Sequence, residues 1–204
     1  MDFSNLKHKL LKLKNKSLPG LKAQLKLAPR SRLKLSEKYF NRDKKDAAVS
    51  ICLFPDSNQK TRIPLILRNS YKGVHSNQIS LPGGKKEKFD YNLIYTAKRE
   101  TSEEIGLNSD FMKFQFELTK LYIPPSNFLV RPFVFTLKSE PIFSIYKKEV
   151  SKILYPKISD LIDMKIHYGP DKNMNENNPY FLIDNHVVWG ATAMILNEFL
   201  SMLK

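Results

Sequence analysis

Three glutamates stand close together near the middle of the chain, at Glu100, Glu103 and Glu104. If this segment is helical, spacings of three and four residues place all three carboxylates on one face. Like charges at these spacings repel, so the cluster gains stability only when a cation joins it. Carboxylate oxygens are the ligands that Mg²⁺ and Mn²⁺ prefer. The cluster therefore predicts a divalent metal site, against the alternative of a solvated acidic face paired with lysines.

The residues around this cluster favour the metal site. Gly83 and Gly84 predict a turn in which the backbone approaches other groups closely or takes a positive φ. Arg99 directly precedes the acids and can hold a carboxylate in place through a forked hydrogen bond. Gly106 is the residue type preferred just after a helix end. A glycine loop, a helix with an acidic face and a closing glycine together predict a loop–helix–loop platform for a metal.

This platform resembles the Nudix box, G-x5-E-x7-R-E-U-x-E-E-x-G-U, in which U is apolar. Its fixed positions are filled by Gly84, Arg99, Glu100, Glu103, Glu104, Gly106 and Leu107. The departures are Asp90 in place of the first glutamate, eight residues rather than seven between Asp90 and Arg99, and Thr101 in place of an apolar residue. The resemblance implies an α/β fold, an α/β/α sandwich around a mixed β-sheet, and metal-dependent cleavage of a diphosphate linkage.

The departures and the flanking sequence resemble the coenzyme A diphosphatase branch of that family. Residues 75–84 are similar to its H-x-G-Q-I-S-F-P-G-G pattern, with Asn77 in place of the glycine and Leu81 in place of the phenylalanine. Residues 125–132 and 188–193 resemble its S-x-F-x-V-x-P and W-G-x-T-A stretches. This resemblance implies hydrolysis of coenzyme A, or an acyl form of it, to 3′,5′-ADP and 4′-phosphopantetheine.

The roles that the resemblance implies begin with metal binding by Glu100, Glu103 and Glu104, with Mg²⁺ or Mn²⁺ as the cofactor. Metal ions held there would bridge the diphosphate oxygens and lower the pKa of a bound water. A carboxylate not fully used in ligation takes the proton of that water, and our first choice is Glu103 and our second Glu149. Arg99 completes the catalytic group by holding a carboxylate in place.

Substrate contacts are expected from both sides of the glycine turn. Gln78 and Ser80 alternate along one predicted strand, so their side chains share a face. A ribose 3′-phosphate would favour basic neighbours, for which Arg68, Lys85 and Lys86 are candidates by their place in the sequence. The predicted substrate-binding residues are Arg68, Gln78, Ser80, Gly83, Gly84 and Lys85.

Two other functions stay open at this point. One is a Nudix diphosphatase for another nucleoside diphosphate linked to a group X, such as ADP-ribose or NADH. The other is a non-enzymatic Nudix module that binds nucleotide or RNA. A degraded box is the usual mark of such a module, whereas this box keeps every metal-binding glutamate.

The elements that must position these residues can be read from hydrophobic patterning. Helices are predicted at 92–105, 158–162 and 191–203. Strands are predicted at 47–54, 63–67, 78–81, 111–123, 129–137, 152–155, 180–183 and 187–189. Pro132 suggests an edge strand or a bulge, because proline cannot donate to a sheet. The asparagine-rich stretch 173–178 predicts a loop.

The charge of the chain is uneven. Residues 1–46 hold 14 of the 34 basic residues and four of the 20 acidic ones, a net of +10 out of +14. We therefore predict a basic N-terminal arm at 1–46 and a Nudix hydrolase domain at 47–204. The arm begins with a basic amphipathic helix that Pro19-Gly20 should end. It is interpreted either as a solvated helix laid on the domain or as a surface for an anionic partner, including a phosphorylated substrate.

The remaining composition narrows the setting. One cysteine, Cys52, lies in an apolar run, which predicts a buried thiol and a reducing, cytoplasmic compartment. No run of about 18 apolar residues occurs, so no membrane span is expected. The expected partner is a small-molecule substrate. Nucleic acid is not expected as a partner, because no aromatic residue interleaves with the lysines between positions 4 and 38. A homodimer is compatible with the sequence, which does not fix the oligomeric state.

Overall fold

The computed structural model describes residues 1–33, 43–70, 77–171 and 174–204, and strand β1 (Lys45–Pro55) runs through its centre. Alternate side chains of β1 point to opposite faces of the sheet. Ile51 and Leu53 join one hydrophobic cluster, while Cys52 and Phe54 join the other. The predicted burial of Cys52 is confirmed, and this burial raises the pKa of its thiol. The alternation shows that both faces of the sheet are covered.

The central sheet is mixed, as predicted. β1 pairs in parallel with β8 (Phe128–Thr136) and antiparallel with β2 (Thr61–Arg62) and β5 (Gly83–Lys85). On its other side, β8 pairs antiparallel with β6 (Lys113–Glu117) and β7 (Leu121–Ile123). Two smaller antiparallel sheets flank it, and their strands are β3 (Leu65–Arg68), β4 (Ile79–Ser80), β9 (Val150–Leu154), β10 (His167–Asp171), β11 (Met174–Ile183) and β12 (His186–Trp189).

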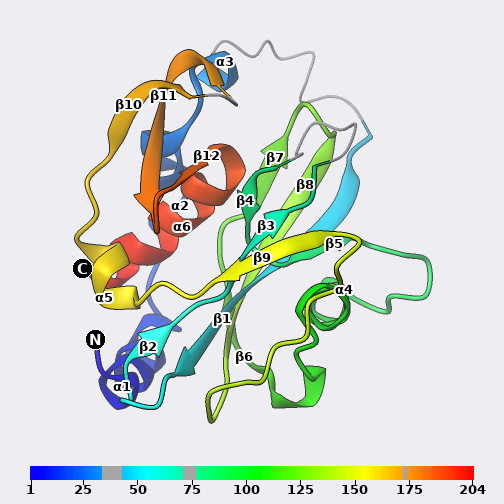
Figure 1. Cartoon of the computed structure of the whole chain (residues 1–204), viewed down its shortest axis with the longest axis vertical. Helices are drawn as coiled ribbons and strands as arrows, with labels where there is room; N and C mark the ends of the chain where they lie inside the picture. The colour runs from blue at the N-terminus through cyan, green and yellow to red at the C-terminus, as the bar shows by residue number, and fades with distance from the viewer. Residues whose placement is uncertain (34–42, 71–76, 172–173) are drawn as a thin grey trace.

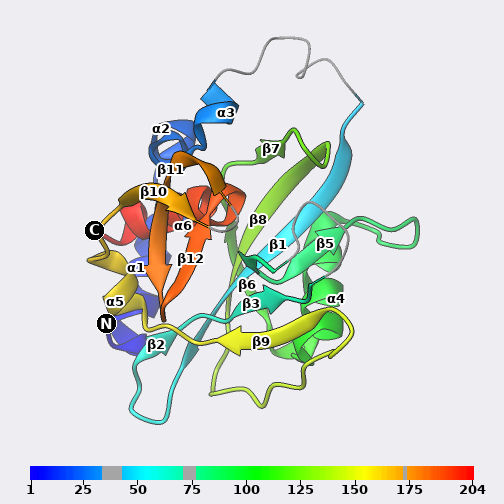
Figure 2. The ribbon, with the colours of Figure 1, turned by 45° about the horizontal axis from the view of Figure 1, so that its top comes forward.

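Helices form a layer on each face of the central sheet (Figures 1 and 2). One face carries α4 (Leu93–Ile105), which packs on β1 and β8. The other carries α6 (Gly190–Leu203), together with the N-terminal helices. The short helices are α2 (Gly20–Gln24), α3 (Arg30–Leu33), α5 (Ile158–Ile162) and the 3₁₀ turns at Leu25–Leu27 and Ser109–Phe111. No helix of the described residues is long and apolar enough to cross a membrane.

The N-terminal segment packs into the core rather than standing apart from it. Helix α1 (Phe3–Leu13) buries Phe3, Leu6, Leu10 and Leu13 in the cluster that also holds the apolar side of α6. This agrees with the interpretation of a helix laid on the domain. The helix ends at Leu13, before Pro19, and α2 begins at Gly20, so the expectation that Pro19-Gly20 ends the first helix was wrong.

A buried carboxylate ties this segment to the rest of the fold. Glu198 of α6 accepts hydrogen bonds from the Gly20 backbone N–H (3.2 Å), Gln24 Nε2 (2.8 Å) and the Thr119 backbone N–H (3.2 Å). It is fully buried, so these donors offset part of the cost of removing its charge from water. These contacts hold α2, α6 and the residues before β7 together. Helix α3 comes shortly after α2 in the chain, so its position depends on these contacts.

Pro132 does not lie on an edge strand, because β8 has neighbours on both sides. The predicted strand 111–123 is instead interrupted between β6 and β7. The Pro132 carbonyl accepts from the Leu118 backbone N–H (2.9 Å) at this interruption. In a strand, the N–H and the C=O of one residue point toward the same neighbouring strand. The N–H that Pro132 lacks would therefore point toward the break between β6 and β7, where no regular strand partner is waiting for it.

The prediction of a loop at 173–178 was also wrong. Of these residues the structure describes 174–178, and they belong to β11. Gly169 pairs with Asn178, and the backbone partners of a hairpin outweigh the preference of asparagine for loops. Asn178 is buried, and its side-chain oxygen accepts from the Arg30 backbone N–H (2.9 Å). This contact holds the beginning of α3 beside β11.

Candidate active site

The acidic helix α4 begins and ends where its sequence predicts. Asn92 caps it by accepting from the Tyr95 backbone N–H (2.8 Å), and Gly106 closes it with φ +69°. These positions supply partners for backbone groups that a helix end leaves unpaired. Leu93, Ala97 and Ile105 are buried against the sheet. The buried stripe fixes the rotation of the helix, which decides where its glutamates can point.

Asp90 and Arg99 form the anchor of the site. Arg99 donates from Nε and Nη2 to the two oxygens of Asp90 (2.9 Å each), a forked pair. Thr96 Oγ1 and the Glu87 backbone N–H also donate to this buried carboxylate (both 2.9 Å). The hydrogen bonds from Arg99, above all, lower the pKa of Asp90 to about 2. The first acid of the box therefore positions the arginine instead of facing the cleft.

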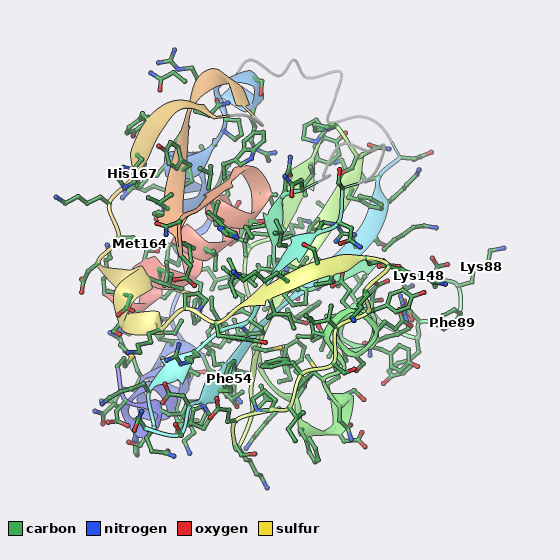
Figure 3. All side chains as sticks on the ribbon, viewed as in Figure 1. Phe54, Lys88, Phe89, Lys148, Met164 and His167 are labelled. Carbon is green, nitrogen blue, oxygen red and sulfur yellow. The ribbon has the colours of Figure 1, made fainter. Side chains whose placement is uncertain are left out.

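From this anchor Arg99 reaches two of the glutamates. Its Nη2 lies 2.9 Å from Glu100 Oε1, and its Nη1 lies 2.9 Å from Glu103 Oε2. Nη2 also donates to the Lys85 carbonyl (3.1 Å). The ring of Phe89 lies 5.4 Å from the guanidinium carbon, and Figure 3 shows Phe89 with Lys88 at the outer end of the loop before α4. Arg99 is a positioning residue that ties the glycine turn to the acidic helix.

The two glycines of the turn have different tasks. Gly83 takes φ +147°, and a Cβ there would lie 2.2 Å from the Ala48 carbonyl oxygen. A Cβ on Gly84 would lie 2.4 Å from Glu100 Oε2. Gly83 thus allows β5 to pair with β1, while Gly84 leaves room for a catalytic-site carboxylate.

Glu104 is the most buried of the three glutamates. It accepts from the Gly83 backbone N–H (2.8 Å) and pairs with Arg68 of β3 (3.2 Å). Burial nevertheless raises its pKa to about 8, and burial also raises the pKa of Glu100. The negative charge of Glu149, in the loop before β9, raises both pKa values further.

The described residues contain no group of three His, Cys, Asp or Glu side chains close enough together to hold a metal ion. In this metal-free arrangement Arg99 pairs with Glu100 and Glu103, while Arg68 pairs with Glu104. The donor set still fits a divalent cation, because it consists of carboxylate oxygens whose mutual repulsion a cation would relieve.

A cleft of about 690 Å³ opens beside these residues. Its lining includes Glu100 and all of the predicted substrate-binding residues, which are Arg68, Gln78, Ser80, Gly83, Gly84 and Lys85. Two buried polar atoms on this wall, Ser80 Oγ and Arg68 Nε, have no hydrogen-bond partner among the described residues. Such atoms are costly unless a ligand or water satisfies them. The structure brings the predicted substrate residues together on one surface.

The remaining predicted residues lie around this cleft rather than in its wall. Glu103 is 56% exposed and turns toward Arg99, and Glu149 is exposed. Lys86 donates its backbone N–H to the Asp46 carbonyl and does not line the cleft. His75, the first residue of the stretch 75–84 that resembles the coenzyme A diphosphatase pattern, lies outside the described residues.

Sequence reasoning missed the N-terminal part of the opposite wall of the cleft. Pro29, Ser31 and Arg32 of the N-terminal segment line it, together with Phe128 of β8 and Trp189 of β12. Phe128 and Trp189 belong to stretches that the sequence resemblance had already singled out, whereas the basic character of residues 1–46 was the signal for the N-terminal residues. Nothing in the sequence places the arm beside the glycine turn, but α3 faces the same cleft.

The anchor gives a first prediction. Asp90→Asn should lower the free energy of unfolding by about 2 kcal/mol at neutral pH, because the pKa of Asp90 falls from 3.8 to about 2 on folding. Because the pKa of Asp90 is lower in the folded protein, its ionised carboxylate stabilises the fold at every pH above the unfolded-state pKa of 3.8. This contribution is lost as the pH falls toward 2. Urea unfolding at stepwise lower pH should therefore show wild type and variant converging. Equal stability at neutral pH would contradict the anchor role.

Residues 44–166 match the model of a family described as the NUDIX domain. Nudix hydrolase 22, chloroplastic, of Arabidopsis thaliana is 48% identical over 64 residues, which are 31% of this chain and 21% of that relative. A probable nudix hydrolase of Schizosaccharomyces pombe is 27% identical over 190 residues, covering 92% of this chain and 66% of that relative. The chain thus spans about a fifth of the length of the plant relative.

Two solved structures share the fold. The NUDIX domain of Shewanella oneidensis NrtR, complexed with ADP ribose, gives a TM-score of 0.53 at 12% identity, covering 85% of this chain and 96% of that one. The MutT protein of Methanosarcina mazei Go1 gives 0.51 at 15% identity, covering 79% and 96%. At these identities the likeness concerns the fold alone. It confirms the predicted α/β arrangement of a mixed sheet between helices.

Proposed function

The chain belongs to the Nudix family and has its fold, and from this premise we propose that it is a metal-dependent diphosphatase that cleaves coenzyme A or an acyl-coenzyme A. The observation that carries the reaction class is the acidic face of α4, fastened by Arg99 beside the glycine turn and open to a cleft through Glu100. The proposed products are 3′,5′-ADP and 4′-phosphopantetheine.

The proposed metal ligands are Glu100, Glu103 and Glu104, which would exchange their arginine partners for Mg²⁺ or Mn²⁺. When bound, the metal would neutralise charge on the diphosphate and make a water molecule more acidic. Before the metal binds, Arg99, which is held by its own forked pair with Asp90, keeps Glu100 and Glu103 beside the glycine turn. Ser80 and Arg68 offer polar atoms to the substrate from the cleft wall.

The proposed proton acceptor is Glu103, with Glu149 as the alternative. The negative charges of Glu103 and Glu149 both contribute to the raised pKa of Glu100. Of these two candidates, Glu149 is the one whose charge also raises the pKa of Glu104. Replacing each by glutamine and recording kcat against pH separates them, because the true acceptor governs the acidic limb of the profile.

The coenzyme A assignment rests on the sequence resemblance around residues 75–84, 125–132 and 188–193, supported by where these stretches lie. Gln78, Ser80, Gly83 and Gly84 from the first line the cleft, as do residues from the other two. Asn77, which replaces a glycine of the pattern, takes φ +56°, a conformation that asparagine tolerates better than most residues. The substitution therefore keeps the backbone shape that the pattern requires.

A substrate screen tests the proposal. Coenzyme A, acetyl-coenzyme A, ADP-ribose and NADH are each incubated with the protein and Mg²⁺ or Mn²⁺, and the products are separated by chromatography. Release of 3′,5′-ADP at the highest kcat/KM supports the proposal. A higher kcat/KM for ADP-ribose or NADH assigns the enzyme to another substrate. Nucleotide binding without turnover of any of them identifies a non-enzymatic module.

Removal of the metal gives a second prediction. EDTA should abolish hydrolysis, and added Mg²⁺ or Mn²⁺ should restore it, because the acidic face supplies only oxygen ligands. Ca²⁺ is a matched control, since it takes oxygen ligands at longer distances and in less regular geometry. Unchanged turnover in a preparation shown by elemental analysis to be free of metal would overturn the proposed metal site.

A further inference from the structure

Within the described part of the chain, three basic side chains line the cleft, and they differ in their partners. Arg68 is paired with Glu104 at 3.2 Å, and the exposed Lys85 lies 3.7 Å from Glu87. Arg32 is partly buried and hydrogen-bonds through Nη1 to the Tyr122 carbonyl. Among the described residues no carboxylate forms an ion pair with it.

A partly buried arginine that is bonded to a carbonyl and not to a carboxylate is suited to an anionic ligand. Burial lowers the pKa of Arg32, and among the residues that the structure describes no acidic side chain pairs with it to offset that loss of hydration. One carbonyl satisfies only part of a guanidinium that has five N–H donors in a fixed fork. A phosphate monoester could accept two of them side by side and supply the missing negative charge.

The strand order places Arg32 far from the acidic helix. Gly84 lies opposite Ala48 on β1, whereas Tyr122 lies opposite Leu129 on β8. The order β5–β1–β8–β7 puts three strand spacings, about 14 Å, between Gly84 and Tyr122. The cleft lining between these two ends is apolar and includes Val49, Ile123, Phe128 and Val130.

We propose that Arg32 binds a second phosphate of the substrate, one carried by the nucleoside and not part of the scissile diphosphate. This rests on the proposed function, in which the glycine turn and α4 hold the diphosphate. The nucleoside lies across the apolar floor of the cleft, and the long side chain of Arg32 meets its phosphate from the far wall. Arg32 thereby selects ribose-phosphorylated nucleotides over nucleotides that lack this group.

The experiment compares coenzyme A with dephospho-coenzyme A, which differs only by the 3′-phosphate. Wild type should show a kcat/KM ratio in favour of coenzyme A of about 10- to 100-fold, the range expected for charge-assisted hydrogen bonds. Arg32→Gln should bring this ratio close to one. Arg32→Lys, which keeps the charge and loses the fork, should leave an intermediate ratio.

Arg30→Gln is the matched control. Arg30 is exposed, does not line the cleft, and lies two residues away on α3, so the variant loses the same charge outside the proposed site. Its substrate ratio should equal that of wild type. An equal fall in both arginine variants would mean general attraction of anions and would overturn the inference.

A structural role for Arg32 predicts a different outcome. Loss of its bond to the Tyr122 carbonyl would then lower kcat/KM for both substrates by the same factor and leave the ratio unchanged, which overturns the inference. Thermal unfolding of each variant accompanies the kinetics. The ratio is measured within one variant, so a partial loss of folded protein cancels.

The inference can also be tested if the proposed function fails, that is, if wild type hydrolyses neither compound. Calorimetric titration then compares 3′,5′-ADP with 5′-AMP. Tighter binding of 3′,5′-ADP to wild type, lost in Arg32→Gln and kept in Arg30→Gln, supports the phosphate site without any turnover. Equal binding of the two nucleotides to wild type overturns it.

Discussion

Replacing Glu104 with glutamine is expected to lower kcat by a factor on the order of 10²–10⁴ while the protein stays folded. The substitution keeps the shape of the side chain and removes the negative charge that a divalent cation requires. Folding should survive, because burial already favours the neutral form of this group and the amide oxygen can still accept from the Gly83 backbone N–H.

The measurement is kcat at saturating coenzyme A and Mg²⁺, with thermal unfolding followed by circular dichroism. Glu140→Gln makes the same chemical change at an exposed position outside the cleft and should keep wild-type kcat. Turnover of the Glu104 variant within a few-fold of wild type would show that the acidic face is a solvated surface. Loss of cooperative unfolding would instead mean that the pair with Arg68 is needed for folding.

Alanine at the two glycines of the turn should separate function from folding. Gly84→Ala places its Cβ 2.4 Å from Glu100 Oε2, the end of a side chain that can move aside. The protein should fold, and the displaced carboxylate should cost about 10²-fold in kcat, the loss expected for a displacement of about 1 Å. Measurements of kcat, and of the Mg²⁺ concentration that gives half-maximal rate, report this displacement.

Gly83→Ala should affect folding instead. Its Cβ would lie 2.2 Å from the Ala48 carbonyl oxygen, a backbone atom that cannot move without breaking the pairing of β5 with β1. The positive φ of 147° adds strain for any residue with a side chain. We expect the free energy of unfolding in urea to fall by about 3 kcal/mol or more. Equal effects of the two substitutions on stability would contradict the division of tasks between these glycines.

The elements of the site that depend on local chemistry could be predicted from the sequence. The limits of α4 follow from Asn92 and Gly106, which pair with backbone groups a few residues away. The shared face of the three glutamates follows from the helical repeat alone. The two buried faces of β1 follow from its alternating side chains and its uninterrupted apolar run.

Partners that are far apart in the sequence could not be predicted in this way. Arg68 meets Glu104 because β3 and α4 approach in the folded chain, across 36 positions. The central position of Pro132 depends on a break in the neighbouring strand, which no property of the proline itself reveals. The asparagines of β11 form a strand because a paired hairpin supplies backbone partners that outweigh their local preference.

The sequence by itself determined the family resemblance, the acidic helix with its caps, and the residue types that the chemistry needs, because these depend on spacings of a few residues. Only the tertiary structure decided that Asp90 faces Arg99 instead of the cleft, and that Arg32 of the N-terminal segment stands across from the glycine turn. The physical reason is that strand register and core packing determine which distant segments share a surface. In this protein, Glu198 contributes by holding α2 against α6.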